Sequence, residues 1–464
     1  MASYSLADEI LAGNVENVYH ILRSGIDVNE IDEYGFTYLV EAAIADNVEI
    51  VKLLLDAGAS VDLSDMAGST ALHWAAENNN LTIAKLLLNK HANPNAYNLA
   101  GQPVLVMPLL RRQSAFKSLL LKYDADLAFA QDYINAKLLG HMFELVGTAD
   151  IISPENEFVE LDFEGFYLEF SVGIIGESLG QFQNHFAARK LRRFGEIAHI
   201  IVNVFDRAAQ LSRFIQYRTD LNLHKTKIDE LIRQEPLLIP IGYEGHAITF
   251  IKLGNILAKC DRREDSRLYD NIMFYRVTRM ENFTHEFIHD FIYKKKSDNF
   301  VNDVLPQLLG LEPITELKVE AQISGNCSWA NVEASIPTIF FLLLLASTED
   351  NKNLGQYKSL ALNYFHQWRE WNKNRALHFC LQSFTEADSI RNACKAEILA
   401  AILYQRLREP RSEADRERIE YILEILKQKR YAHVLENYIR TYCFESFSEE
   451  GKVFSQLLKE YGVM

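Results

Sequence analysis

A repeat with a period of 33 residues occupies the first part of the chain and limits the folds open to it. Three segments align in register, namely Gly35–Leu39, Gly68–Leu72 and Gly101–Leu105. Two apolar runs also match each other, one at 51–58 after the first segment and one at 84–91 after the second. Their Leu-Leu-Leu triplets can fill the layer between neighbouring repeats, so the units are expected to stack. The sequence therefore predicts an α-solenoid of four repeats over residues 1–128.

The repeat resembles the ankyrin repeat. Residues 70–76 read Thr-Ala-Leu-His-Trp-Ala-Ala, which is close to the T-P-L-H-x-A-A motif of that family. Thr70 can cap the first helix of its repeat, and Gly58 permits a left-handed turn after a second helix. We expect His73 to be a structural hydrogen-bonding residue and not a ligand.

The ankyrin resemblance implies a protein partner, because such repeats bind proteins through their hairpin tips and inner helices. Trp74 fits the core of the solenoid equally well. The candidate partner-binding residues are Tyr34, Met66 and Leu99 at the tips, with Glu41 and Trp74 at equivalent helix positions.

The length, net charge and cysteine content of the chain limit its domain count and its possible partners. A chain of 464 residues is too long for one core, so two to four domains are expected. The net charge of −15 opposes direct nucleic-acid binding, because no basic surplus neutralises phosphates. Five cysteines without a CxxC pair exclude a zinc ribbon and fit a reducing compartment. We expect no cofactor, no signal peptide and no membrane span, since the apolar run 336–346 is too short.

A cysteine with catalytic features lies in the stretch 322–330. Cys327 follows a Gly-Asn turn and precedes the apolar run Trp329–Ala346, which predicts a buried helix. A thiol in the first turn of a helix meets unpaired N–H groups, which favour the nucleophilic thiolate. Gln322 could donate its side-chain N–H to a developing oxyanion. The alternative is that Cys327 is a small buried residue, as most cysteines are.

A base and a carboxylate are predicted upstream of this cysteine. Gly254-Asn255 separates two β-rich runs and is a hairpin signal. His246 begins the first run and Asp261 ends the second, so antiparallel pairing brings the two side chains together. A general base and its orienting carboxylate require that proximity.

The order His246, Asp261, Gln322, Cys327 resembles the cysteine peptidase clan of the SUMO-specific proteases and the YopJ-like bacterial effectors. Papain-like enzymes share the triad geometry in another chain order. The resemblance covers about residues 235–335. It implies that Cys327 is the nucleophile, His246 the general base, Asp261 its orienter and Gln322 the oxyanion donor. The Trp after the histidine and the Asp-Cys-Gly of the SUMO proteases are absent, which leaves the substrate open.

A second pattern competes with this site. Residues 285–289 read His-Glu-Phe-Ile-His, the H-E-x-x-H pattern of zinc proteases. A third ligand would have to be Glu312 or Glu316, in a stretch that looks like a loop. The favoured alternative is an amphipathic helix that buries Phe283, Phe287, Ile288 and Phe291, and we expect no metal.

The whole chain is predicted to be an α+β, multi-domain protein. Residues 158–172 alternate and indicate a strand or hairpin, whereas residues from 351 onward read as helices without chemistry. The expected domains are ankyrin repeats at 1–128, a cysteine-peptidase-like α+β domain at 129–350 with a helical insertion at about 180–235, and an all-helical cap at 351–464.

Ankyrin repeats joined to this order of site residues resemble the ankyrin effectors that bacteria secrete through a Dot/Icm type IV system. The resemblance implies delivery into a host cell, to the cytoplasm or nucleus, and a host protein bound through the repeats. The expected activity is that of a thiol protease or isopeptidase acting on a peptide or ubiquitin-like substrate. The alternatives are an acyltransferase using the same triad, and a non-catalytic scaffold with a degenerate peptidase fold.

Overall fold

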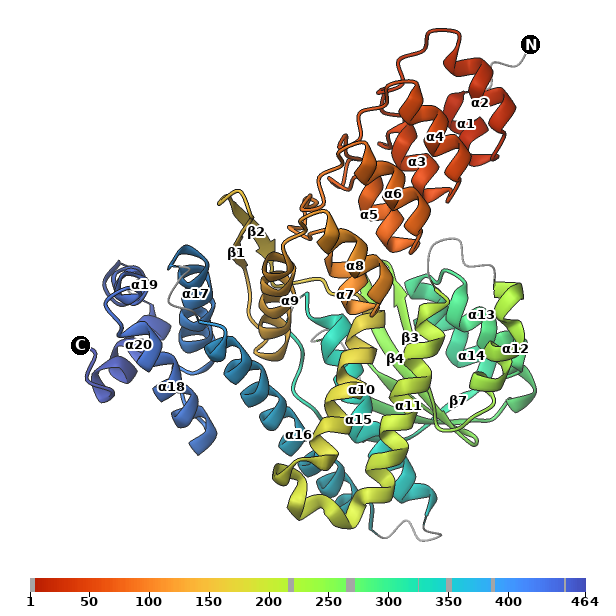
Figure 1. The fold of residues 1–464 in the computed structure, drawn as a ribbon. Helices are drawn as coiled ribbons and strands as arrows, with labels where there is room; N and C mark the ends of the chain where they lie inside the picture. The colour runs from red at the N-terminus through yellow and green to blue at the C-terminus, as the bar shows by residue number, and fades with distance from the viewer. Residues whose placement is uncertain are drawn as a thin grey trace. The chain divides into compact units, whose positions relative to one another are not determined.

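The computed structural model describes residues 5–215, 221–263, 272–323, 325–347, 353–384, 389–445 and 448–464 (Figure 1). Its contacts divide the chain into two compact units. Unit 1 consists of Met1–Ala136, Thr148–Asp162 and Ala387–Lys395. Unit 2 consists of Lys137–Gly147, Phe163–Glu386 and Ala396–Met464. The units are thus interleaved in the sequence, unlike the continuous domains expected at 1–128, 129–350 and 351–464.

Unit 1 begins with four pairs of short helices, as the repeat predicts. Thr37 begins the second pair, and its hydroxyl accepts a hydrogen bond of 3.1 Å from the Val40 N–H. Such a bond satisfies one of the unpaired donors at a helix start. The helices are α1 (Leu6–Leu11), α2 (Val15–Leu22), α3 (Tyr38–Ile44), α4 (Val48–Asp56), α5 (Ala71–Glu77), α6 (Leu81–Asn89), α7 (Val106–Leu110) and α8 (Ser114–Lys122).

Helix α9 (Leu127–Met142) follows the repeats, and an antiparallel hairpin of β1 (Thr148–Ile152) and β2 (Phe158–Asp162) completes this part of unit 1. The strand predicted over 158–172 is therefore wrong for its second half, because Leu168 already begins helix α10 (Leu168–Asn184). Gly165 adopts a φ of +67° after the strand. Beyond it, buried apolar residues recur at helical spacing and outweigh the alternation seen in the sequence.

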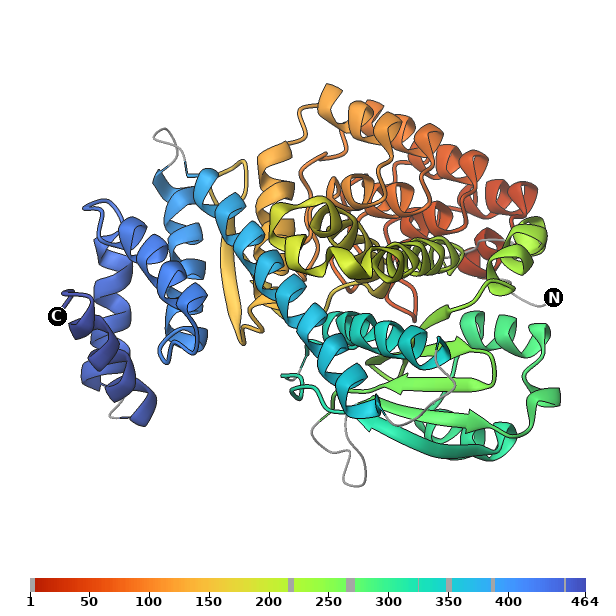
Figure 2. The same ribbon diagram turned by 90° about the horizontal axis from the view of Figure 1, so that it is seen from below.

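Unit 2 contains a five-stranded antiparallel sheet in the order β3-β4-β5-β6-β7. One face of β4 turns Ile248 and Phe250 into a core with Phe291 of α13, while Thr249 on the other face hydrogen-bonds α15. The sheet therefore lies between these two helices (Figure 2). The elements are β3 (Leu237–Tyr243), β4 (His246–Leu253), β5 (Ile256–Cys260), β6 (Ile272–Val277), β7 (Leu311–Leu317), α13 (His285–Tyr293) and α15 (Cys327–Ala346).

The helices around α15 complete its burial. Helices α10, α11 and α16 (Leu354–Gln382) all pack against α15, and the Phe340 and Tyr364 rings lie 5.1 Å apart where α15 meets α16. The remaining elements of this part are η1 (Phe186–Phe194), α11 (Gly195–Arg213), α12 (Leu221–Ile232), η2 (Met280–Asn282), η3 (Phe300–Val304) and α14 (Leu305–Leu309).

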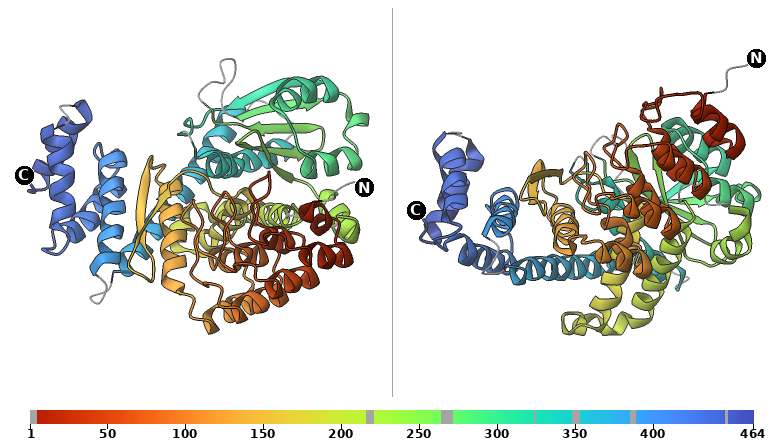
Figure 3. Two further views of the ribbon diagram at one scale, coloured as in Figure 1. Left: turned by 90° about the horizontal axis from the view of Figure 1, so that it is seen from above. Right: turned by 45° about the horizontal axis from the view of Figure 1, so that its top comes forward.

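The last third is helical, as predicted, and α16 leads into its C-terminal helices (Figure 3). The elements are α16 (Leu354–Gln382), α17 (Ser389–Arg406), α18 (Glu413–Leu426), α19 (Ala432–Tyr438), η5 (Ile439–Glu445) and α20 (Glu449–Glu460). The predicted α+β, multi-domain class with an N-terminal repeat solenoid is confirmed.

Helix α15 has the length and apolar composition of a membrane span, the only such helix in the described part of the chain. In the protein, 78% of its most apolar window is buried. It contacts β4, β5 and α16, as the core helix of a globular protein does.

A candidate Cys-His-Asp site

Cys327 is the first residue of α15, with Asn326 immediately before the helix. Its sulfur is half-buried and accepts a hydrogen bond of 3.4 Å from the Ala247 N–H. Ala247 is the residue after His246, so the cysteine lies at the beginning of β4. The buried helix predicted from Trp329–Ala346 is confirmed, and the backbone N–H groups of Ala247 and Ser328 bind the Cys327 sulfur, which favours the thiolate.

His246 and Asp261 come together through the predicted hairpin. Leu253 pairs with Ile256, so the turn consists of Gly254 and Asn255, and Gly254 has a φ of +59°. The His246 Nε2 and the Asp261 Oδ1 lie 3.0 Å apart. Because Nε2 faces the carboxylate, Nδ1 is the ring nitrogen that can accept the proton of the Cys327 thiol.

The three groups shift one another's pKa. Burial raises the pKa of the Cys327 thiol, but interactions with His246 and with the Ala247 N–H outweigh it, so the pKa is lowered. Burial lowers the pKa of His246, but Asp261 and Cys327 outweigh it, so the pKa is raised. Both shifts favour a thiolate beside an imidazolium.

Asp261 is held in its charged form. Burial raises the pKa of this carboxyl, but His246, Arg263 and Lys259 outweigh burial and hold the pKa far below its usual range. Arg263 lies 2.9 Å and Lys259 3.4 Å from the Asp261 Oδ2. Asp261 is therefore ionised at neutral pH, and its carboxylate can orient the imidazole of His246.

Gln322 is held by hydrogen bonds from both its backbone and its side chain. Its backbone N–H donates to the Arg262 carbonyl at 2.9 Å, and its side-chain Oε1 accepts from the Asn331 Nδ2 at 3.3 Å. These two bonds fix the Gln322 backbone and its side-chain oxygen, and the oxyanion role of Nε2 stays a prediction.

Asn331 lies one turn of α15 after Cys327, and the sequence did not predict that it belongs to the site. It is completely buried; its Oδ1 accepts from the Arg262 N–H at 2.8 Å, and its Nδ2 donates to the Ala247 carbonyl at 2.7 Å. One amide thus joins the segments that carry Asp261, His246 and Gln322. A polar residue four positions after the cysteine, inside an apolar run, was the available signal.

The loop before Cys327 is fixed by a second group of contacts. The Asn326 Oδ1 lies 2.6 Å from the His141 Nδ1, and His141 stacks on Trp329 with centroids 6.2 Å apart. Burial lowers the pKa of His141 to about 4, so the ring is neutral at pH 7. Gly325 has a φ of +79°, and a Cβ there would lie 2.2 Å from the Glu164 side chain.

Arg262, directly after Asp261, is also buried and was not predicted. Its Nη1 binds the Glu333 carboxylate at 2.8 Å and the Ala330 carbonyl at 3.2 Å. The end of the hairpin is thus tied to α15 by an arginine whose charge is compensated inside the protein.

The predicted partner-binding residues of unit 1 fall into two groups. Tyr34, Met66 and Leu99 are 70%, 75% and 79% exposed, so all three are accessible. Glu41 is 3% exposed, and its assignment as a partner contact is corrected because its carboxyl lies inside the repeat beside Asp32. Trp74 is half-buried, and its Nε1 donates to the Asp65 Oδ2 at 3.0 Å.

His73 has the structural role that its motif predicts. Its Nδ1 accepts from the Thr70 N–H at 3.1 Å, which leaves Nε2 to donate to the Gln102 carbonyl at 3.3 Å. Burial lowers the pKa of His73 to about 4. The neutral ring therefore links two successive repeats.

The H-E-x-x-H residues lie on α13, which buries Ile288 and Phe291. Within the described residues, no group of three potential ligands gathers to hold a metal ion. The loop expected around Glu312 and Glu316 is wrong, because both lie in β7, where β-pairing with β6 fixes the backbone. The packing agrees with an amphipathic helix.

The repeats define an ankyrin-repeat protein, and unit 2 of that protein places Cys327, His246 and Asp261 close together. The family model for ankyrin repeats matches three copies over residues 6–98. No curated protein matches the chain.

Among solved structures, the chain is similar to the Legionella effector AnkH. The two share 38% sequence identity and a TM-score of 0.84, over 100% of this chain and 98% of that one. The chain therefore belongs to the family of AnkH-like ankyrin-repeat effectors.

Proposed function

We propose that this protein is a secreted effector that acts in a host cell as a thiol protease or isopeptidase, with the ankyrin repeats selecting its target. The observation that carries the proposal is the 3.0 Å contact between the His246 Nε2 and the Asp261 Oδ1, at the beginning of β4, where the Ala247 N–H donates to Cys327. Membership in the AnkH-like effector family supports the host setting.

In the proposed reaction, His246 Nδ1 takes the thiol proton and Cys327 Sγ attacks the carbonyl carbon of a peptide or isopeptide. The tetrahedral oxyanion accepts a hydrogen bond from Gln322 Nε2. The C–N bond then breaks, and the imidazolium gives its proton to the leaving amine. Water, deprotonated by His246, hydrolyses the thioester and restores the thiol.

The partner surface is proposed at the repeat tips. Tyr34, Met66 and Leu99 are large apolar side chains at the hairpin tips of successive repeats, and they are among the most exposed in the described chain. Aromatic and methionine side chains are typical anchors of protein interfaces. The host protein bound there would be the substrate or would bring it.

The proposed reaction is tested on the full chain with a ubiquitin-like protein and a peptide that each carry a C-terminal electrophile. We expect covalent labelling of Cys327 that is lost in Cys327→Ala and strongly reduced in His246→Ala. Cys260→Ala is the matched control, because Cys260 is buried and burial raises its pKa to about 11.

Other results would favour the alternatives. A thioester on Cys327 formed from acetyl-coenzyme A, without labelling by either probe, would indicate an acyltransferase. If Cys327 reacts no faster than an ordinary thiol and no probe labels it, only the scaffold hypothesis remains. In that case, replacing Tyr34, Met66 and Leu99 together should still abolish binding of the host protein.

A further inference from the structure

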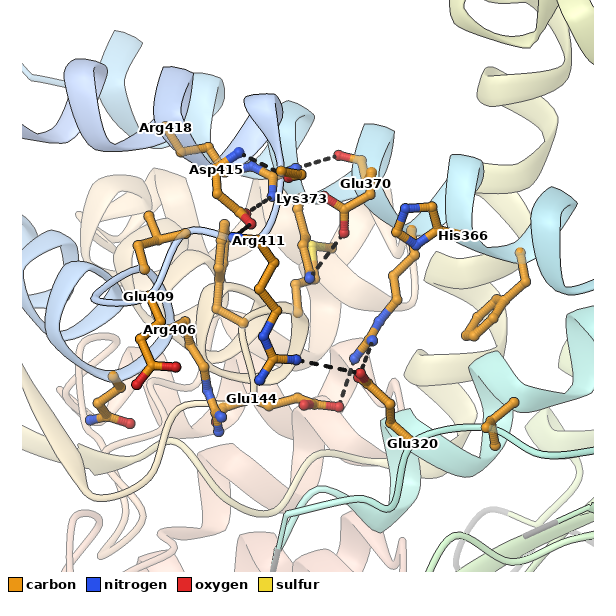
Figure 4. Close-up of a pocket in the computed structure, with 18 of the residues that line it drawn as sticks. Glu144, Glu320, His366, Glu370, Lys373, Arg406, Glu409, Arg411, Asp415 and Arg418 are labelled. Atoms are coloured by element: carbon orange, nitrogen blue, oxygen red, sulfur yellow. Dashed lines mark hydrogen bonds and ion pairs between the residues drawn. The ribbon is translucent and has the colours of Figure 1, made fainter. Parts of the chain in front are cut away.

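A cavity of about 580 Å³ lies within unit 2, and none of the four candidate catalytic residues lines it. Its walls come from the end of α9, the segment 318–320 before Gln322, helix α16 and the connection from α17 to α18. Figure 4 shows Arg406 and Arg411 extending from the C-terminal part toward Glu144 and Glu320 on the opposite wall. A space of this size suits a small molecule.

The lining is strongly charged and has a positive surplus. Eight lysine or arginine side chains face five carboxylates in a protein whose net charge is −15. Glu333, behind the wall, reduces that surplus by one charge. The basic lining residues are Arg262, Lys318, Arg369, Lys373, Arg406, Arg408, Arg411 and Arg418.

About half of these cations are neutralised by carboxylates of the protein. Arg369 lies 2.7 Å from Glu144 and 3.3 Å from Glu333. Lys373 and Arg418 both contact Glu370, at 3.2 and 2.7 Å. These pairs form the fixed part of the wall.

The guanidinium groups of three lining arginines have no carboxylate within 3.5 Å in the described part of the chain. Within the described residues, neither Arg406 nor Arg408 forms an ion pair, and Arg411 reaches only Glu320 at 3.7 Å with a side chain that is 81% exposed. The Arg406 Nε is buried and has no hydrogen-bond partner. A buried donor of this kind is costly unless a ligand satisfies it.

The positive charges also oppose one another. Burial lowers the pKa of Arg406, Glu144 acts against that effect, and the nearby Arg408, Arg369 and Arg411 lower it further. An anion between them would relieve both the repulsion and the unpaired donor.

We propose that this cavity binds a small phosphate-bearing anion, and that Arg406, Arg408 and Arg411 hold its phosphate groups. Planar guanidinium groups bind phosphate oxygens through paired hydrogen bonds, which explains arginine at these positions. A phosphate group also carries more charge than a single carboxylate, so one ligand can balance several of the exposed cations. This site is separate from Cys327 chemistry and goes beyond the proposed function.

Binding is tested by titration calorimetry of the full chain at constant ionic strength, with tripolyphosphate, ATP or citrate. We expect tripolyphosphate or ATP to bind with a dissociation constant below about 1 mM. Tighter binding of ATP would identify a nucleotide, and tighter binding of tripolyphosphate an inorganic or non-nucleotide phosphate. Citrate carries a similar charge on carboxylates and should bind at least about tenfold more weakly.

The variant Arg408→Ala/Arg411→Ala should weaken phosphate binding by at least about tenfold, because it removes two charge-assisted contacts. Arg440→Ala is the matched control, since Arg440 is 67% exposed on a C-terminal helix and does not line the cavity. Thermal unfolding of the unliganded variants establishes that they are folded. The proposal is overturned if neither phosphate compound binds, if citrate binds equally well, or if the arginine variant binds like the control.

Discussion

The side chain of Asn331 donates a 2.7 Å hydrogen bond to the backbone carbonyl of Ala247. That bond connects the helix that begins with Cys327 to the strand that begins with His246. The same amide accepts from Arg262, beside Asp261. One buried side chain that takes no part in the proposed chemistry thus helps to fix the relative placement of Cys327, His246 and Asp261.

Asn331→Ala should lower the stability of unit 2 and the reactivity of Cys327. The change leaves the Arg262 N–H and the Ala247 carbonyl buried without partners, at a cost of roughly 1–3 kcal/mol for each unsatisfied group. Urea unfolding measures the first effect and the iodoacetamide alkylation rate of Cys327 the second. Ser335→Ala, one turn further along α15, is the control and should leave the alkylation rate unchanged. Equal alkylation rates in Asn331→Ala and wild type would contradict the positioning role.

Alkylation of Cys327 should show a midpoint below pH ~8.5, the ordinary value for a thiol. The His246 imidazole and the Ala247 N–H lower its pKa despite burial, so more thiolate is present at neutral pH. In His246→Ala the midpoint should rise, and the rate at pH 7 should fall by about tenfold for each unit of that rise. Peptide mapping distinguishes Cys327 from Cys260, which should not react. A wild-type midpoint at or above that of a free thiol would exclude an activated nucleophile.

Glu41→Gln should stabilise unit 1 at alkaline pH. Burial, followed by a hydrogen bond with Asp32, raises the pKa of Glu41 to about 8. The folded protein therefore keeps a proton that the unfolded chain releases above about pH 4.5, and this stability is lost as pH rises toward 8. The glutamine cannot ionise, so the advantage of the variant should grow by up to ~1.4 kcal/mol per pH unit. Urea unfolding at pH 5 and pH 8 measures it, with exposed Glu49→Gln as the control.

Acid should destabilise unit 1 through His73. Burial lowers its pKa to about 4 in the folded state, whereas the unfolded histidine binds a proton below about pH 6.5. Stability due to the neutral ring is thus complete above pH 6.5 and is lost as pH falls toward 4. Since Glu41 has the opposite effect, the comparison is made in the Glu41→Gln background. Adding His73→Gln should reduce the loss between pH 6.5 and 5, and an unchanged slope would refute the assignment.

Features with local sequence signals were predictable. The 33-residue period locates the helix pairs, since each pair is a repeat of the same local interactions. Gly254-Asn255 fixes a two-residue turn, and that turn determines which residues of β4 and β5 lie opposite one another. The proximity of His246 and Asp261 follows from that register.

Features that depend on distant segments were not predictable. Asn331 acquires its role from residues 69 and 84 positions away, and nothing near it in sequence indicates them. Glu41 occupies a position that faces a partner in an idealised repeat. In this chain its carboxyl is buried within the repeat and hydrogen-bonds the side chain of Asp32. Residues 168–172 alternate like a strand over a short window, and only the longer helical spacing up to Phe182 decides their structure.

Asp132 shows how the interleaved sequence affects the choice of fragments for finding a host target. Its buried carboxylate lies 3.5 Å from Arg391 and 3.3 Å from Lys395, which belong to unit 1 although some 260 residues separate them along the chain. A fragment that stops after α9 keeps the Asp132 carboxylate but loses both cations and the hairpin of residues 148–162. Used as bait, it would expose surfaces that the intact protein covers and would capture proteins that never meet the effector. A target search should therefore use the complete chain, with Cys327→Ala retaining any substrate.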